Sequence, residues 1–184
     1  RDSNNTAVGF RAMDKNTTGT NNVGIGHDAM RCNTTADFNT AVGVCSMCTN
    51  VTGEENTAVG FKALTTSTVS NNTAFGSQSL RDTTTGADNT AVGRDALKVN
   101  TEGGQNVAIG NCALVTNTTA SNNVAVGEIT LRVNTTGANN TAIGRAALAA
   151  NTTGHSNIAV GTSSLVSNTT GTSNVAIGFE ASRL

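Results

Sequence analysis

Residues 140–144 read Asn-Thr-Ala-Ile-Gly, and Leu148 and the run Asn151-Thr152-Thr153-Gly154 follow them. Nearly all of the chain consists of copies of this unit. Its glycine recurs every seventeen residues, except for one step of sixteen. The glycines are Gly9, Gly26, Gly43, Gly60, Gly76, Gly93, Gly110, Gly127, Gly144, Gly161 and Gly178. A short fixed period is typical of a solenoid, because each repeat cannot bury its own apolar face and stacks on its neighbours.

The composition suits one repetitive domain that spans residues 1–184. Aromatic residues make up 3% of the chain and charged residues 12%, which is compatible with disorder, but a disordered chain has no reason to keep Val or Ile in register. The run Arg1-Asp2-Ser3 resembles the tail of a turn, and Leu184 stops before the next Asn-Thr-Thr. We therefore expect a segment of a longer array or filament.

The charge pattern argues against two classes of partner. A net charge of -1 with scattered signs leaves no basic stripe for nucleic acid. No apolar run approaches the length that spans a bilayer, and Arg1 opens no signal peptide. We expect neither nucleic-acid binding nor membrane insertion.

The position four residues before each glycine is always asparagine. Stacked amides can hydrogen-bond along a parallel array, and asparagine tolerates tight turns, so this column predicts an asparagine ladder at a corner. The column comprises Asn5, Asn22, Asn39, Asn56, Asn72, Asn89, Asn106, Asn123, Asn140, Asn157 and Asn174.

Small and larger apolar residues alternate just before each glycine. Two residues before it stands Ala, or Gly24 in one copy, and one residue before it stands Val, Ile or Phe75. Such alternation between turn residues predicts a short strand with a different contact on each face. Charged residues avoid these columns, so we expect them to be interior or interfacial.

A second short strand is expected after the glycine. The third residue after it is Ala, Ser or Thr130, and the fourth is Met or Leu, except for Ser182 in the last copy. The glycine itself should form the corner between the two strands, since only glycine takes a positive φ cheaply. The Asn-Thr-Thr-Gly run should then close the turn through its hydroxyl and amide groups.

One thin coil offers little apolar burial. A single Leu and a single Val per turn must offset the backbone entropy of about seventeen ordered residues. The economical solution packs one face of the strand inside the coil and the other against sister chains. We therefore expect a homo-oligomer.

The run Asn106-Val107-Ala108-Ile109-Gly110 and its copies resemble the head repeats of trimeric autotransporter adhesins and related phage and viral fibre proteins. The resemblance covers the whole chain. It implies a left-handed parallel β-roll, three chains about one axis, and a place on a cell or particle surface. The repeats here are longer than the usual adhesin repeats because Asn-Thr-Thr-Gly enlarges the turn, and no neck, coiled-coil stalk or membrane anchor is seen.

The chain has four cysteines, Cys32, Cys45, Cys48 and Cys112. Cys45 and Cys48 form a Cys-x-x-Cys pair that could suggest redox or metal chemistry, but no second pair follows, so we interpret them as ordinary repeat positions. Cys32 and Cys48 occupy adjoining columns in neighbouring turns. A strand spacing of about 4.8 Å brings them within range of a disulfide, which we predict.

No set of residues indicates catalysis, a cofactor or a metal. His27 and His155 lie in different columns and distant turns, and Glu54, Glu55 and Asp88 are expected to be solvated turn residues. No nucleophile elbow, phosphate loop or zinc spacing occurs. We expect the protein not to be an enzyme.

Seven asparagines of the Asn-Thr-Thr column are acceptor sequons for N-glycosylation, and Asn4, Asn71 and Asn139 are sequons elsewhere. A secretory route could therefore attach one row of glycans to the solenoid; otherwise the motif serves only as turn chemistry. The seven are Asn16, Asn33, Asn50, Asn117, Asn134, Asn151 and Asn168.

Rows of threonine also raise the alternative of an ice-binding solenoid. The two threonines of each Asn-Thr-Thr run are adjacent, so in a strand they would point to opposite faces. The other threonine column is diluted by residues such as Val23, Val107 and Ile158. Both features count against a flat threonine array.

Together these patterns predict an all-β, parallel β-solenoid (β-roll) of about eleven 17-residue turns, on the order of 50 Å long and homotrimeric. The expected function is a structural or adhesive segment of an extracellular fibre or filament, on a cell surface or a virion appendage. The alternatives are a glycan-binding surface adhesin or viral tail-fibre head, which could use the exposed column of Phe10, Phe61, Phe179 and Arg94, and the ice-binding solenoid.

Overall fold

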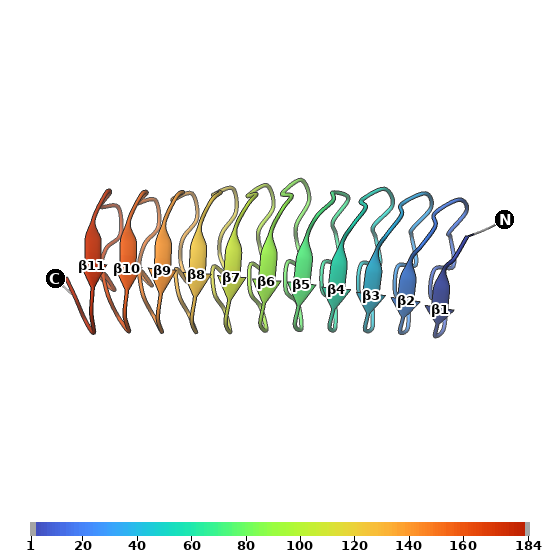
Figure 1. Cartoon of the computed structure of the whole chain (residues 1–184), viewed down its shortest axis with the longest axis horizontal. Coiled ribbons are helices and arrows are strands. Elements are labelled where there is room, and N and C mark those ends of the chain that lie inside the picture. Colours follow the sequence, from blue (N-terminus) through green and yellow to red (C-terminus); the bar gives the residue numbers. More distant parts are fainter. Residues whose placement is uncertain (1–2, 183–184) are drawn as a thin grey trace.

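The computed structural model describes residues 3–182 and shows a parallel β-solenoid (Figure 1). The features that the sequence suggests at Arg1, Asp2 and Leu184 lie outside this range. Each repeat contributes one three-residue strand. The strands are β1 (Thr6–Val8), β2 (Val23–Ile25), β3 (Thr40–Val42), β4 (Thr57–Val59), β5 (Thr73–Phe75), β6 (Thr90–Val92), β7 (Val107–Ile109), β8 (Val124–Val126), β9 (Thr141–Ile143), β10 (Ile158–Val160) and β11 (Val175–Ile177).

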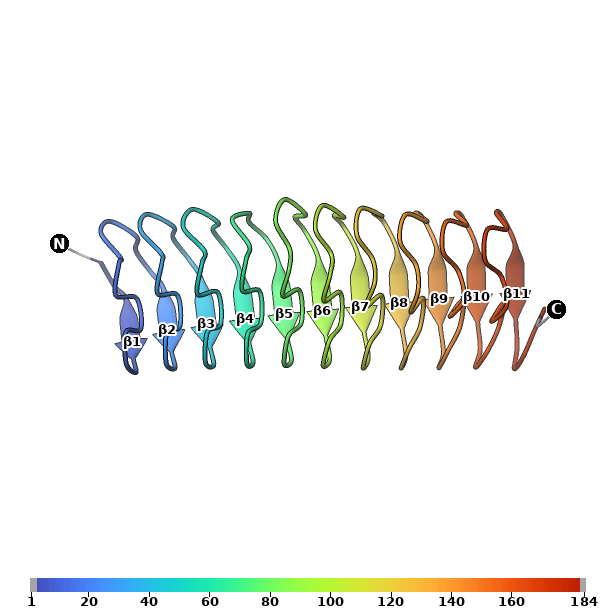
Figure 2. The same cartoon turned by 180° about the vertical axis from the view of Figure 1, so that it is seen from behind.

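The eleven strands form one sheet in chain order, and every neighbouring pair is parallel and in register. Figure 2 shows the same row from behind, with the loops of successive turns stacked on one another. The sixteen-residue step leaves the register intact, because Val59 pairs with Phe75 and Phe75 with Val92. The sixteen-residue repeat is one residue shorter in its loop. Only Thr68 lies between Ser67 and Val69, whereas other turns have two residues between the corresponding positions. The predicted solenoid and its register are confirmed.

The core is two rows of side chains that meet inside the coil. The central alanines of β3 to β11, with Gly24 in the same place in β2, are one row. The methionines and leucines four residues after the glycine, from Met13 to Leu165, are the other. Ala108 and Leu114 are both 0% exposed. The alanine face is therefore the inner face of the sheet. Nothing larger than a methyl group is needed there, because the long methionine and leucine side chains fill the opposite wall.

The predicted asparagine ladder is confirmed, and its side chains are buried. Asn106 is a representative rung. Its Oδ1 accepts a hydrogen bond from the backbone N–H of Asn123 at 3.0 Å, and its Nδ2 donates to the carbonyl of Ala120 at 2.9 Å. Its own backbone N–H donates to Asn89 Oδ1 at 3.0 Å. The side-chain amide of Asn106 thus satisfies two buried backbone groups, the Asn123 N–H and the Ala120 carbonyl, and its own N–H is satisfied by the rung before it.

A second asparagine ladder lies seven residues after the glycine and runs in two blocks. In the longer block, Asn117 Nδ2 donates to Asn100 Oδ1 at 2.8 Å, and the same bond repeats to Asn168. Ser67 and Thr83 occupy this column in the middle of the coil. Their side chains are too short to bridge two turns, so the ladder is interrupted there.

The predicted second strand is wrong. No strand of the described residues follows the glycine; residues two and four after it have positive φ, as at Lys62 (54°) and Leu64 (49°). A left-handed residue cannot continue a strand, and it costs a branched or long side chain roughly 1–2 kcal/mol. This bent segment still directs the methionines and leucines into the core.

The glycine corner is confirmed. All eleven glycines have φ between 126° and 140°, a region that residues with a Cβ rarely adopt. The turns are also too close for a side chain: a Cβ at Gly93 would lie 2.5 Å from the carbonyl oxygen of Gly110 in the next turn.

Candidate functional site

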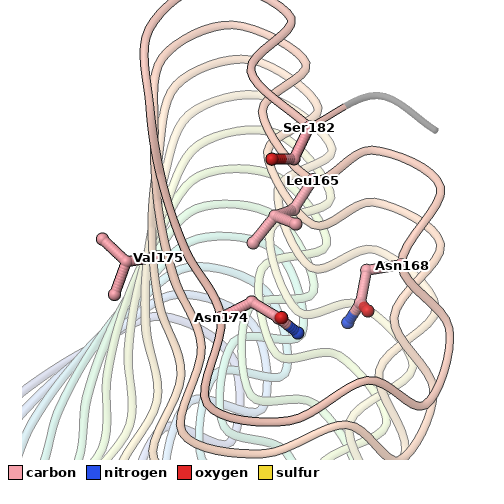
Figure 3. Close-up of a pocket in the computed structure, with 5 residues that line it drawn as sticks. All are labelled: Leu165, Asn168, Asn174, Val175 and Ser182. Atoms are coloured by element: carbon pink, nitrogen blue, oxygen red, sulfur yellow. The ribbon is translucent and has the colours of Figure 1, made fainter.

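The outer face of the sheet is the candidate functional surface. Each strand points its first and third residues outward, because its central alanine points inward. Figure 3 looks along the coil and shows the same arrangement at one end: Val175 points away from the coil, whereas Leu165 and Asn174 point into it. We call the outward first and third residues of β1 to β11 the outer strip. It carries only Thr, Val, Ile and Phe75.

The outer strip is apolar and accessible. Phe75 is 54% exposed, Ile109 40% and Ile143 41%, although in-register neighbours cover part of each side chain. A row of eleven strands at about 4.8 Å spacing, three residues wide, covers on the order of 500 Å². That area is at the upper end of the apolar patches that monomeric proteins expose. The strip is therefore large enough to be considered as a functional surface.

The column just after the glycine widens this surface in some turns. Phe10, Val44, Phe61 and Phe179 are exposed there, whereas Arg94 and other polar residues occupy the same column elsewhere. Phe10 and Phe61 are three turns apart, or about 15 Å. The phenylalanines of the glycan-binding alternative are thus exposed but do not converge on one sugar-sized site.

A charged cluster lies on the first turns. Arg11 Nε donates to Asp28 Oδ1 at 2.8 Å, and His27 Nδ1 lies 3.1 Å from Asp28 Oδ2. The Arg11 hydrogen bond holds the pKa of Asp28 below its ordinary value, against the opposing effect of burial. The Phe10 and His27 rings are 5.3 Å apart. The carboxylate of Asp28 is occupied by these partners, so the cluster is an ion-pair network of the turn surface.

The seven sequons of the Asn-Thr-Thr column face the interior. Asn33, Asn50, Asn117, Asn134 and Asn151 are 0% exposed, and Asn16 and Asn168 are half-buried. The Nδ2 atom, which would carry a glycan, donates a hydrogen bond in all seven.

Three other sequons, Asn4, Asn71 and Asn139, are exposed on the surface. An N-linked glycan on a buried asparagine would remove its ladder hydrogen bond and would need space inside the coil. Glycosylation itself stays a prediction, and the folded geometry favours these three asparagines as acceptors over the seven in the ladder.

All four cysteines are free thiols, so the predicted Cys32–Cys48 disulfide is not formed in the structure. The backbones of the two residues do meet, with Cys32 N–H donating to the Cys48 carbonyl at 3.1 Å. Their side chains, however, have different neighbours. The Cys32 sulfur lies 4.0 Å from Arg31 Nη2, whereas Cys48 is buried. The Cys45-x-x-Cys48 pair, interpreted from the sequence as ordinary repeat positions, lies on the bent segment after Gly43.

Burial of Cys48 gives a measurable prediction. Desolvation, helped by the hydrogen bond with Cys45, raises the pKa of Cys48 to about 12. The thiolate is the reactive form, so we expect Cys48 to be alkylated by iodoacetamide at least 100-fold more slowly at about pH 8 in the folded chain than after denaturation. Peptide mass spectrometry after timed quenching would measure this. Equal rates in the two states would contradict it.

The same raised pKa makes stability depend on pH. The unfolded thiol loses its proton at a lower pH than the folded one. The contribution of Cys48 is therefore fully present below the unfolded pKa and is lost as the pH rises toward about 12.

The threonines of the Asn-Thr-Thr runs form hydrogen bonds between successive turns. The first threonine donates its hydroxyl to the backbone carbonyl one turn on, as Thr118 does to Thr135 at 3.2 Å and Thr135 does to Thr152 at 3.1 Å. These hydroxyls therefore serve stacking. The arrangement differs from the free, paired threonine rows that the ice-binding alternative requires.

Within residues 3–182, no group of three or more His, Cys, Asp or Glu side chains is placed to hold a metal ion. His27 and His155 are far apart, as expected. The hollow in Figure 3 is lined by Leu165, Asn168, Asn174, Val175 and Ser182. Its polar groups are the last rungs of the two asparagine ladders, so it is an extension of the core. No helix capable of crossing a membrane occurs in the described part of the chain.

Comparison of the sequence with models of protein families finds no match, and comparison with curated protein sequences finds none either. The outer strip and the repeat pattern are therefore the features of the molecule that indicate a function.

Proposed function

We propose that the protein is a structural segment of an extracellular fibre or filament, in which copies of the solenoid associate through their outer strips. The observation that carries the proposal is the uncharged and largely apolar surface of the sheet. It runs from β1 to β11 and contains no charged residue. A soluble protein gains by covering such a surface, and identical chains offer identical strips of the same length.

Three copies around one axis are the arrangement we propose. The strip covers about 500 Å², which is close to the roughly 500 Å² per partner at which a specific interface begins. In a trimer the three strips face a common axis, and each chain contacts two neighbours that also touch the column after the glycine. The resemblance to adhesin and fibre head repeats supports the same number of chains.

The rest of the chain suits a rigid spacer. The coil is held by backbone hydrogen bonds, by one continuous asparagine ladder and by a second, interrupted one, and some of its charged surface residues form local ion pairs, such as Arg145 with Glu128 at 3.2 Å. A rod of stacked turns transmits force and keeps its ends apart, as a fibre requires. Extracellular placement on a cell or particle surface is part of the same proposal.

The test is the association state after a charge is placed on the strip. The double variant Ile109→Lys with Val126→Lys puts two ammonium groups at its centre, where uncompensated burial costs several kcal/mol. We expect the unchanged chain to sediment as a trimer and the double variant to associate at least about 100-fold more weakly. Analytical ultracentrifugation over a concentration series would measure both.

Val115→Lys is the matched control. Val115 lies five residues after its glycine, in a column where Lys98 and Arg132 occur naturally. We expect this variant to remain trimeric. Far-UV circular dichroism would show that all variants keep the solenoid. An unchanged chain that stays monomeric at high concentration, or a double variant that associates normally, would rule out the strip as the interface.

A further inference from the structure

We propose that Cys45 and Cys48 are an exchangeable dithiol, a modification site at which a small disulfide such as oxidised glutathione converts the two thiols into a disulfide within one turn. This site lies on the bent segment after Gly43, away from the outer strip. The inference goes beyond the structural role proposed above and does not depend on it.

The bent segment brings the residues two and five after each glycine together. Arg31 Nη1 lies 4.0 Å from Asp28, Lys98 Nζ lies 3.1 Å from Asp95, and Arg81 donates to Gln78 at 2.8 Å in other turns. A short side chain at the later position also reaches back, since Thr65 Oγ1 donates to the carbonyl of Lys62 at 2.8 Å. The backbone geometry therefore pairs these two columns in turn after turn.

In the third turn the paired positions are both cysteine. Cys45 stands two residues and Cys48 five residues after Gly43, in the two columns that pair in other turns, whereas the Cys32 sulfur lies 4.0 Å from Arg31 Nη2. Cys45 is half-buried and Cys48 is 5% exposed. This arrangement favours a disulfide between Cys45 and Cys48 over one between Cys32 and Cys48. Cys45 is the more accessible of the two thiols.

The exposures set the order of the two exchange steps. The Cys45 thiol loses its proton to solvent and attacks one sulfur of the small disulfide. The bond between the two halves breaks, and one half leaves and takes up a proton as a free thiol. Cys48 then loses its proton and attacks the Cys45 sulfur, which expels the second half as a thiol. Two cysteine thiols are oxidised and one small disulfide is reduced, so no other oxidant is needed.

The second step should be slow near neutral pH, because Cys48 ionises reluctantly, and should accelerate as the pH rises. Cys112 provides a comparison inside the same chain. It occupies the same column as Cys45, but its partner position holds Val115. Cys112 can therefore form a mixed disulfide but cannot close a ring.

The experiment incubates the full chain with oxidised glutathione at about pH 8, quenches with acid, and maps each cysteine by mass spectrometry without reduction. We expect an internal Cys45–Cys48 disulfide, with a retained glutathione adduct at Cys112. The variant Cys32→Ser should give the same result. In Cys45→Ser the internal disulfide should be lost, and dithiothreitol should restore all thiols in the unchanged chain.

Three outcomes would overturn the proposal. One is an internal disulfide that survives Cys45→Ser but disappears in Cys32→Ser, which would assign the bond to Cys32 and Cys48. Another is a glutathione adduct that persists at Cys45, as it does at Cys112, even when the pH of the incubation is raised. The third is a disulfide found only between chains on a non-reducing gel.

Discussion

Gly93→Ala is expected to lower the free energy of unfolding by about 3 kcal/mol or more. Two costs combine at this position. The backbone φ of 133° is strained for any residue with a Cβ, and the new methyl group would lie 2.5 Å from the carbonyl oxygen of Gly110. That oxygen belongs to backbone fixed by the stacking of turns, so it cannot move without breaking ladder hydrogen bonds on either side.

Gly104→Ala is the matched control for this prediction. Gly104 lies in a column where Ala87 and Ala138 occur naturally, and its added Cβ would lie no closer than 3.0 Å to its neighbours. We expect a change within about 0.5 kcal/mol. Chemical denaturation followed by circular dichroism would compare the two variants. Because turns contact only their neighbours, Gly93→Ala should also broaden the transition by dividing the coil into two blocks. Equal stabilities of the two variants would refute the proposed glycine corner.

Asn106→Asp is expected to be comparably severe at neutral pH, with a loss of about 3–5 kcal/mol. The side chain is 0% exposed, and its amide nitrogen donates to Ala120 and Asn89. A carboxylate cannot donate, so it leaves the Ala120 carbonyl unpaired and faces it with a buried negative charge. The Asn123 N–H still has an acceptor.

The Asn106→Asp defect should shrink in acid. Burial raises the pKa of the introduced carboxyl in the folded state above its unfolded value. The protonated form is stabilised relative to the charged one, so stability is greatest below the unfolded pKa and falls as the pH rises through the folded pKa. A protonated carboxyl can also donate one hydrogen bond. Urea denaturation at about pH 4 and at about pH 8 would measure the difference.

Asn122→Asp is the control, because Asn122 is exposed and Asp88 occupies the equivalent place in another turn. We expect little change at either pH. A loss for Asn106→Asp that is the same at both pH values, or no larger than that of Asn122→Asp, would show that the ladder is not a structural requirement.

Much of the fold follows from residue types repeated at fixed positions. An invariant asparagine column has few satisfactory arrangements other than a ladder, and a glycine in every copy indicates a backbone conformation that other residues avoid. For the candidate surface, the sequence predicted the absence of charge but not which face of the strand is exposed. Alternating Ala and Val or Ile columns showed that both faces of the strand exclude charge, but both faces are apolar, so the pattern does not say which one lies inside.

Sequence reasoning failed after the glycine, for an identifiable reason. The adjacent Ala12 and Met13, repeated after each glycine, were interpreted as part of a second strand, yet Met13 and Leu64 adopt left-handed backbone conformations. Residues with long side chains disfavour that conformation locally, so no propensity argument selects it. The Cys45-x-x-Cys48 pair was interpreted as ordinary repeat positions for the same reason, because the pairing of its two columns depends on the bend.

By itself the sequence determined the period, the parallel stacking in register, the asparagine ladder and the glycine corner, because each depends on chemistry that repeats identically from turn to turn. Only the tertiary structure decided that alanine faces the methionine and leucine row while valine and isoleucine face outward. The physical reason is the narrow width of the coil: with Leu or Met on one wall, the opposite wall has space for a methyl group and no more. That choice leaves the apolar outer strip exposed and makes self-association the function to test.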